Sequence, residues 1–347
     1  MYKNTLTIKL NNIAIMKTIM MIAVVLCHSC AFFCEGWFEY VKPFYKSINI
    51  GKFSDWLGTF HIQTFTMASG FLFYYMKFEK NKYNDWKNDI RKRFIRLMIP
   101  YFFTSLLWVV PFYGYFYGFN IKNIITNYIF MKAPSQLWFL VMLFLVFLCF
   151  YFISNKTKIS FKNFAFIYVI GVLGYYTLAH FGIKYFQLDR VCLYSVYFYL
   201  GGILYKYGYR LNIKNIILMF FMCCLLYYSI NGGVLKILNN QFIHYGLMIV
   251  EPVISILEVC IIYYLGTWLV NSNKFNVENK LYKSLEENSF GIYLFHQQII
   301  YVTILIFNGR VLPICQVMLS FIISLMVSLF MSLVLKKNKY TKFIFGL

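Results

Sequence analysis

The sequence predicts an all-α, polytopic integral membrane protein, and three observations carry that prediction. Of the 347 residues, 61% are hydrophobic and 13% are charged, whereas about a quarter of the residues of a soluble domain are charged. The apolar residues fall into runs about as long as a bilayer-spanning helix, separated by short Lys- and Asn-rich breaks. No polar stretch is long enough for a soluble domain, so we expect residues 1–347 to form a single transmembrane domain.

The apolar runs predict about ten transmembrane helices. They cover residues 13–34, 57–77, 97–117, 137–154, 163–180, 191–207, 215–231, 243–270, 289–308 and 313–335. The net charge of +21 would suggest a nucleic-acid ligand in a soluble protein, but here the cations lie in the breaks between spans. Most of the 33 Lys and Arg residues fall on one side if the N-terminus is cytoplasmic. By the positive-inside rule we expect both termini in the cytoplasm.

The first span carries two ionisable residues, Lys17 and His28. They lie three helical turns apart, roughly 16 Å, on nearly the same face. Such groups are costly in lipid and therefore face a polar interior, where they are candidates for function. The alternative is that His28 is a hydrogen-bonded packing residue and that Lys17 extends to the lipid headgroups.

The break between the second and third spans is the most basic part of the chain, KFEKNKYNDWKNDIRKRFIR at residues 77–96. Arg93 and Arg96 share one helix face, with Lys92 nearby. Two guanidinium groups on one face suit a phosphate-rich ligand. Topology and the binding of anionic headgroups would explain the same pattern.

The second span opens with Thr59-Phe60-His61 at its predicted outer end and contains Ser69 and Gly70 in its middle. A Ser-Gly pair inside an apolar helix predicts a close contact with another helix. His61 is read either as an interfacial histidine or as a catalytic one. Trp138, at the start of the fourth span, serves either as an interfacial anchor or as a wall of a substrate cleft.

The eighth and ninth spans supply further polar residues. Glu251 and Glu258 lie two turns apart on one helix face. Glu251 is a candidate partner for a buried cation or histidine, and a purely structural ion pair is the alternative. His296 is a third interior histidine, and Gln297 and Gln298 beside it are typical of hydrogen bonding between helices.

The nine cysteines lie almost entirely in apolar runs. Cys27, Cys30 and Cys34 share one helix face beside His28, but no second pair of metal ligands lies nearby in the sequence. We therefore read them as small packing residues and expect no metal site.

Five stretches, taken together and in this order, resemble the acyltransferase-3 family of membrane acyltransferases. They are Lys17 with His28, FHIQTFTMASGFLF at 60–73, RKRFIRLMIPY at 91–101, LWFL at 137–140 and NSFGIYLFH at 288–296. The chain departs from the family pattern at Lys17, where arginine is common, and at Ile62-Gln63, where Met-Pro is frequent. The middle spans match no family motif.

The resemblance implies a membrane-bound O-acyltransferase of the bacterial cytoplasmic membrane. It would move an acyl group, most commonly acetyl, from cytoplasmic acyl-CoA to a hydroxyl of an extracytoplasmic surface glycan or lipid-linked saccharide. It would work within membrane lipid, with acetyl-CoA as donor substrate, no bound cofactor and no nucleic-acid partner. The alternative is a transporter or exporter of a glycan or lipid-linked intermediate, which would use the same polar interior without acyl chemistry.

The same resemblance suggests roles for the candidate residues. Arg93 and Arg96, with Lys92, would hold the phosphates of the donor. His28 would act as a general base or as a transient acyl carrier. Lys17 would orient the thioester or bias the surroundings of His28, and Glu251 would hold its tautomer. The acceptor cleft would be formed by His61, Trp138 and His296.

Overall fold

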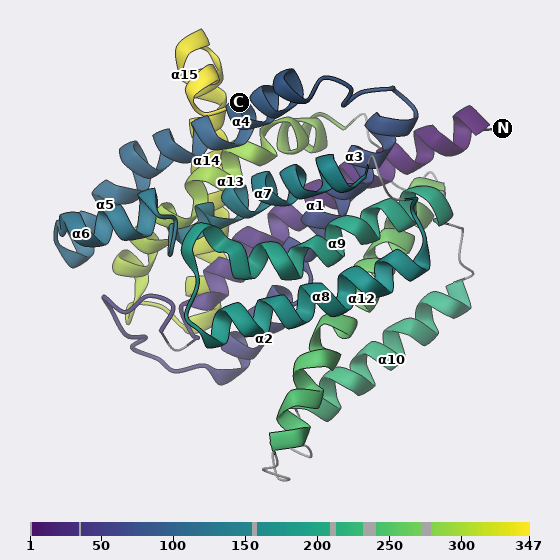
Figure 1. Cartoon of the computed structure of the whole chain (residues 1–347). Helices are drawn as coiled ribbons and strands as arrows, with labels where there is room; N and C mark the ends of the chain where they lie inside the picture. Colours follow the sequence, from purple (N-terminus) through teal and green to yellow (C-terminus); the bar gives the residue numbers. More distant parts are fainter. Residues whose placement is uncertain (1, 35, 155–157, 209–212, 232–240, 272–278) are drawn as a thin grey trace.

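The computed structural model describes residues 2–34, 36–154, 158–208, 213–231, 241–271 and 279–347, and the regular elements in these ranges are all helices (Figure 1). Seven of these helical segments are long and apolar enough to cross a membrane. The prediction of an all-α, multi-pass membrane protein is therefore confirmed. The other three predicted spans, 57–77, 191–207 and 215–231, coincide with helices that are not among these seven.

The helices overlap the predicted spans, but those that begin at Tyr2, Trp86 and Lys280 start nine to eleven residues before the predicted spans 13–34, 97–117 and 289–308. The first half of the chain forms α1 (Tyr2–Ala31), α2 (Ile48–Gly58), α3 (His61–Phe78), α4 (Trp86–Thr104), α5 (Val110–Tyr117), α6 (Ile121–Ile124) and α7 (Trp138–Ile153). The second half forms α8 (Phe161–His180), α9 (Leu188–Tyr207), α10 (Ile213–Asn231), α12 (Gln241–Asn271), α13 (Lys280–Phe307), α14 (Pro313–Lys336) and α15 (Lys339–Ile344). Short π or 3₁₀ turns are η1 (Ser105–Val109), η2 (Ile125–Ile129), η3 (Ser135–Leu137) and η4 (Tyr185–Gln187).

Side-chain caps explain where several of these helices begin. Asp85 accepts a hydrogen bond from the backbone of Asn88 at the start of α4, and Asn279 does the same for the first turn of α13. Each cap satisfies backbone N–H groups that have no partner inside the helix. The polar breaks that the sequence places before these spans therefore fix the start of each helix.

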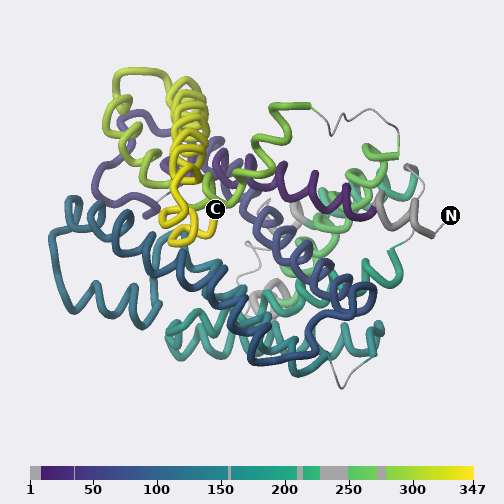
Figure 2. The backbone as a smooth tube through the Cα atoms, turned by 90° about the horizontal axis from the view of Figure 1, so that it is seen from above, coloured from purple at the N-terminus to yellow at the C-terminus, as the bar shows by residue number. Residues whose placement is uncertain are grey.

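Helix α1 runs through the centre of the molecule and contacts α2, α3, α12, α13 and α14 (Figure 2). Its apolar side chains are buried on several sides, as Ile15 and Val25 show with no exposed surface. A helix that is surrounded in this way holds its polar residues at fixed positions in the interior.

Helices α3 and α9 cross at two glycines. A Cβ atom added to Gly70 would lie 1.9 Å from the carbonyl oxygen of Phe198, and one added to Gly201 would lie 2.2 Å from that of Met67. Only glycine allows the two backbones to approach this closely. The predicted role of the Ser69-Gly70 pair in a close helix contact is confirmed.

Helices α13 and α14 are joined by a row of buried serines. The Oγ atom of Ser324 donates to the carbonyl oxygen of His296 at 2.9 Å, and that of Ser332 donates to Oδ1 of Asn288 at 2.9 Å. The row recurs every fourth residue along one face of α14 and comprises Ser320, Ser324, Ser328 and Ser332. These contacts fix the rotation of α13 about its axis and thereby the position of His296.

Candidate active site

Two histidines from opposite ends of the chain meet in the interior. Nδ1 of His28, on α1, lies 2.9 Å from Nε2 of His296, on α13. Their rings stack with centroids 5.0 Å apart and an interplanar angle of 20°. His296 has no exposed surface, whereas His28 is only half-buried. Of the two imidazoles, His28 is therefore the one with accessible surface.

The partners of the two rings determine which nitrogen carries each proton. Nδ1 of His296 lies 2.8 Å from the carbonyl oxygen of Tyr293 and 3.1 Å from that of Ile292. Carbonyl oxygens only accept hydrogen bonds, so this nitrogen carries the proton and Nε2 of neutral His296 has a lone pair. Nδ1 of His28 must then donate to it. The lone pair of neutral His28 is thereby placed on Nε2.

A third histidine, His61, lies close to this pair. It is buried at the first turn of α3, where its Nδ1 donates to the carbonyl oxygen of Leu57 at 2.5 Å. His61 is near enough to interact electrostatically with both His28 and His296. The sequence places the three histidines on three separate spans, and the structure brings them together.

Aromatic rings lie beside His28. The ring of Trp37 lies 5.8 Å from that of His28 and 5.2 Å from that of Tyr301. Phe38 stacks on Tyr301 at 4.5 Å. Sequence reasoning missed these residues, although the segment that follows the first span is visibly rich in aromatic side chains.

A cavity of about 870 Å³ opens beside the middle of α1, where Lys17 lines it. Its charged lining consists of Lys17, Arg93, Arg96, Glu286, Glu287, Lys339 and Lys342. The volume lies in the range of small-molecule and cofactor sites. With five cations and two carboxylates, the lining suits an anionic ligand. Of these residues, sequence reasoning singled out Lys17, Arg93 and Arg96.

The cavity continues from its cationic end into an apolar wall near the histidines. Phe65, Phe139 and Tyr293 belong to this wall. The ring of Tyr293 lies 6.2 Å from that of His296. The cavity therefore reaches within one aromatic ring of the histidine pair, and it offers a ligand a charged end and an apolar end.

Arg93 is held by two aromatic side chains. Its guanidinium lies 4.3 Å from the ring centroid of Phe147 and donates to the hydroxyl of Tyr83 at 3.3 Å. Such contacts orient the planar guanidinium toward the cavity. Lys92, the third residue expected to bind the donor, is exposed on another face of α4 and is not among the residues that line the cavity.

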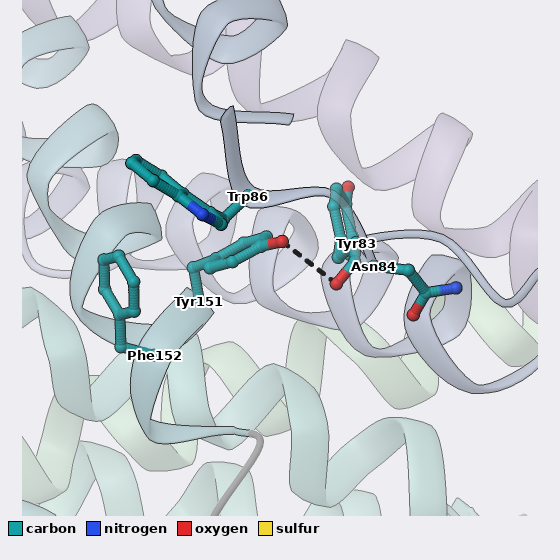
Figure 3. A pocket seen from close by; sticks show the side chains of 5 residues that line it. All are labelled: Tyr83, Asn84, Trp86, Tyr151 and Phe152. Carbon is teal, nitrogen blue, oxygen red and sulfur yellow. Dashed lines mark hydrogen bonds between the residues drawn. The ribbon is translucent and has the colours of Figure 1, made fainter. Parts of the chain in front are cut away.

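A smaller pocket of about 430 Å³ adjoins this region, and its lining consists of Tyr83, Asn84, Trp86, Tyr151 and Phe152 (Figure 3). The hydroxyl of Tyr151 donates to the carbonyl oxygen of Tyr83 at 3.1 Å. Tyr83 lines both this pocket and the larger cavity. The hydrogen bond therefore fixes the wall that separates the two.

Two other expected site residues lie in different surroundings. Trp138 packs under the guanidinium of Arg190, 4.1 Å away, and beside the ring of Tyr194. Glu251 is exposed on α12 and interacts with Tyr176 of α8. The nitrogen that Nδ1 of His28 faces belongs to His296, so this imidazole occupies the place expected for Glu251.

Glu258, two turns further along α12, is the buried carboxylate of this helix. It accepts a hydrogen bond from Thr59 at 2.7 Å. Gln298 accepts a hydrogen bond from Gln136 at 2.8 Å, which confirms the prediction that the glutamines of α13 join helices. In the described ranges, no group of three His, Cys, Asp or Glu side chains converges in the way that a metal ion requires.

These features define a multi-pass membrane protein in which a cationic cavity leads toward a pair of imidazoles, one buried and one half-buried. A profile of the acyltransferase-3 family, described as an acyltransferase domain, matches residues 10–333. The chain belongs to this family, which assigns it acyltransferase activity. No curated protein and no solved structure gives a significant match to the chain.

Proposed function

We propose that this protein transfers an acyl group, acetyl in the simplest case, from cytoplasmic acyl-CoA to a hydroxyl of an extracytoplasmic surface glycan in a bacterial cytoplasmic membrane. The observation that carries the proposal is the half-buried His28, oriented by His296, beyond the apolar end of a cation-lined cavity. This arrangement offers separate places for a phosphate-bearing donor and for a hydroxyl acceptor.

The donor would lie in the cavity. Arg93 and Arg96 would bind its phosphates through paired N–H groups, which match phosphate oxygens in geometry. Lys17 also lines the cavity and is close enough to Arg96 and Glu286 to interact with them electrostatically. Because Lys17 is roughly 16 Å from His28 along α1, we place it with the phosphates rather than at the thioester.

The histidine pair would supply the acid–base chemistry. In the general-base mechanism, Nε2 of His28 takes the proton of the acceptor hydroxyl while the hydroxyl oxygen bonds to the carbonyl carbon of the thioester. The carbon–sulfur bond then breaks, and the thiolate leaves with the proton that His28 took. His296 accepts a hydrogen bond from Nδ1 of His28 throughout and stabilises the imidazolium. As an acyl carrier, His28 would attack the thioester carbon with the same lone pair and expel the CoA thiolate. The acceptor hydroxyl would then take the acyl group from Nε2 of His28, and its proton would leave with the thiolate.

The acceptor would approach from the aromatic side of His28. Trp37 and Tyr301 lie there, and Gln297 donates to the hydroxyl of Tyr301. Aromatic faces and hydrogen-bonding groups are suited to polyhydroxylated ligands. His61 lies near both imidazoles and would form the wall of the cleft on the α3 side.

The test is release of free CoA thiol from acetyl-CoA by the purified full-length protein, with and without the surface glycan of its host. We expect glycan-dependent release, and His28→Ala should lower it by about 10²- to 10⁴-fold. The variant should reach the membrane in the normal amount with an unchanged melting temperature. The proposal would be refuted if the folded wild-type protein released no more thiol with the glycan than without it. Full activity of the His28→Ala variant would refute it as well.

A further inference from the structure

Two cations of the large cavity come from a helix that lies outside the five stretches that resemble the family. Lys339 and Lys342 belong to α15, the short helix that follows the last span, and both line the cavity together with Arg93 and Arg96 of α4. The sequence alone gives this lysine-rich tail only a topological meaning. In the structure α15 lies beside α4 (Figure 1) and closes one side of the cavity.

The segment is anchored by its own packing. Phe345 is 8% exposed, and its ring lies 5.4 Å from that of Phe295 on α13. Gly346 has a φ of +64° and is wedged against α4, because an added Cβ would lie 2.7 Å from Cγ of Pro100. The backbone N–H of Leu347 donates to the carbonyl oxygen of Lys342 at 3.0 Å. These contacts hold the two lysines over the cavity.

The cations lie in an order that matches the layout of an acyl-CoA. Lys339, Lys342 and Arg96 are exposed at the rim of the cavity, Arg93 is half-buried further in, and the apolar wall follows. In an acyl-CoA the adenosine 3′-phosphate lies at one end, the diphosphate comes next, and the less polar pantetheine arm carries the thioester. With the thioester at the histidines and the diphosphate at the arginines, the 3′-phosphate reaches the rim.

We propose that Lys339 and Lys342 bind the 3′-phosphate of the donor and thereby select CoA thioesters over thioesters that lack this group. The inference rests on the proposed acyl-CoA donor and adds a specificity site to it. A phosphate monoester carries close to two negative charges at neutral pH. Two ammonium groups on one short helix provide a matching charge without requiring fixed hydrogen-bond geometry.

The experiment compares acetyl-CoA with acetyl-dephospho-CoA as donors, using the full-length protein in phosphatidylcholine nanodiscs. We expect the wild type to prefer acetyl-CoA by about 10- to 100-fold in kcat/KM, the range given by hydrogen bonds to charged groups. The K339Q/K342Q variant should lose this preference through a higher KM for acetyl-CoA. Its kcat/KM for acetyl-dephospho-CoA should fall much less than that for acetyl-CoA, and an unchanged melting temperature shows that the variant is folded.

The matched control is K87Q/K337Q, which removes two exposed lysines that do not line the cavity. It should keep the wild-type preference. A direct binding measurement with adenosine 3′,5′-bisphosphate and with adenosine 5′-monophosphate gives a readout without acyl transfer. K339Q/K342Q should weaken binding of the bisphosphate only.

The outcomes separate this inference from the proposed function. Active transfer with an unchanged preference in K339Q/K342Q would overturn the lysine site and leave the acyl-CoA donor in place. If K339Q/K342Q changed the KM for acetyl-CoA only in anionic vesicles and not in phosphatidylcholine nanodiscs, the lysines would be assigned to the lipid surface. That result would also overturn the inference. If the wild type neither releases thiol nor binds the bisphosphate, the donor assignment and the lysine site both fail.

Discussion

Nδ1 of His28 lies 2.9 Å from Nε2 of His296, although 268 residues separate them in the sequence. The contact joins the first and the ninth predicted spans, and it gives the two imidazoles different tasks. His296 is fully buried and bound to backbone carbonyls, so it is suited to orient its partner. Nε2 of His28 has no hydrogen-bond partner among the described residues, and the side chain keeps some exposed surface, so His28 is suited to meet the substrate. The division resembles that between the orienting acid and the base of a catalytic triad.

Removing the acceptor nitrogen of His296 should slow the chemistry without weakening donor binding. We expect His296→Leu to lower kcat by about 100-fold, the effect of misplacing a reacting group by about 1 Å, with little change in the KM for acetyl-CoA. His296→Gln should recover part of the rate, because its amide oxygen can accept the hydrogen bond from His28. Steady-state kinetics of the two variants provide the measurement. Equal losses in both would show a role in packing alone.

Replacing Arg93 or Arg96, which line the cavity, should weaken donor binding more than replacing Lys92. Arg96→Gln and Arg93→Gln remove cavity cations, and we expect each to raise the KM for acetyl-CoA by about 10- to 100-fold. Lys92→Gln removes the same charge from an exposed position outside the lining, so its effect should be much smaller. Initial rates as a function of acetyl-CoA concentration distinguish these cases. Similar values for Lys92→Gln and Arg96→Gln would indicate a diffuse electrostatic effect instead.

The acceptor should be sensitive to the tryptophan beside His28. Trp37→Ala removes the ring that lies 5.8 Å from the imidazole, and we expect the KM for the glycan to rise by about 10-fold. Trp138→Ala removes a ring that packs against Arg190, so the acceptor KM should change less. Titrating the glycan at saturating acetyl-CoA measures both. The reverse order would place the acceptor at Trp138.

The sequence alone identifies site residues where a single local feature has a large free-energy cost. Ionisable side chains inside apolar runs are expensive, so Lys17, His28 and His296 stand out without a structure. The pairing of His28 with His296 leaves no such trace, because it depends on how α13 is rotated by the serines of α14. Helical periodicity likewise places Glu251 and Glu258 on one face, but only the packing of α12 decides that the second of them is buried.

The C-terminal segment with α15 shows that the sequence alone also could not reveal every residue that lines the cavity. Lys339 and Lys342 read as a topology signal until the fold places α15 over α4. Arg93 and Arg96 were recognisable because two guanidinium groups on one helix face form a pattern within a single element. Residues that reach a site from different elements require the tertiary structure.

The close crossing of α3 and α9 makes a prediction about stability that is independent of the chemistry. Gly70→Ala would place a methyl group 1.9 Å from the carbonyl oxygen of Phe198, so the helices must separate. Overpacking of this kind costs about 1–3 kcal/mol, and because Ser69 lines the cavity, donor affinity should fall as well. Gly58→Ala is the matched control, since no atom lies within 4 Å of its added Cβ. Thermal unfolding of both variants in detergent gives the comparison, and an unchanged melting temperature for Gly70→Ala would contradict the crossing described above.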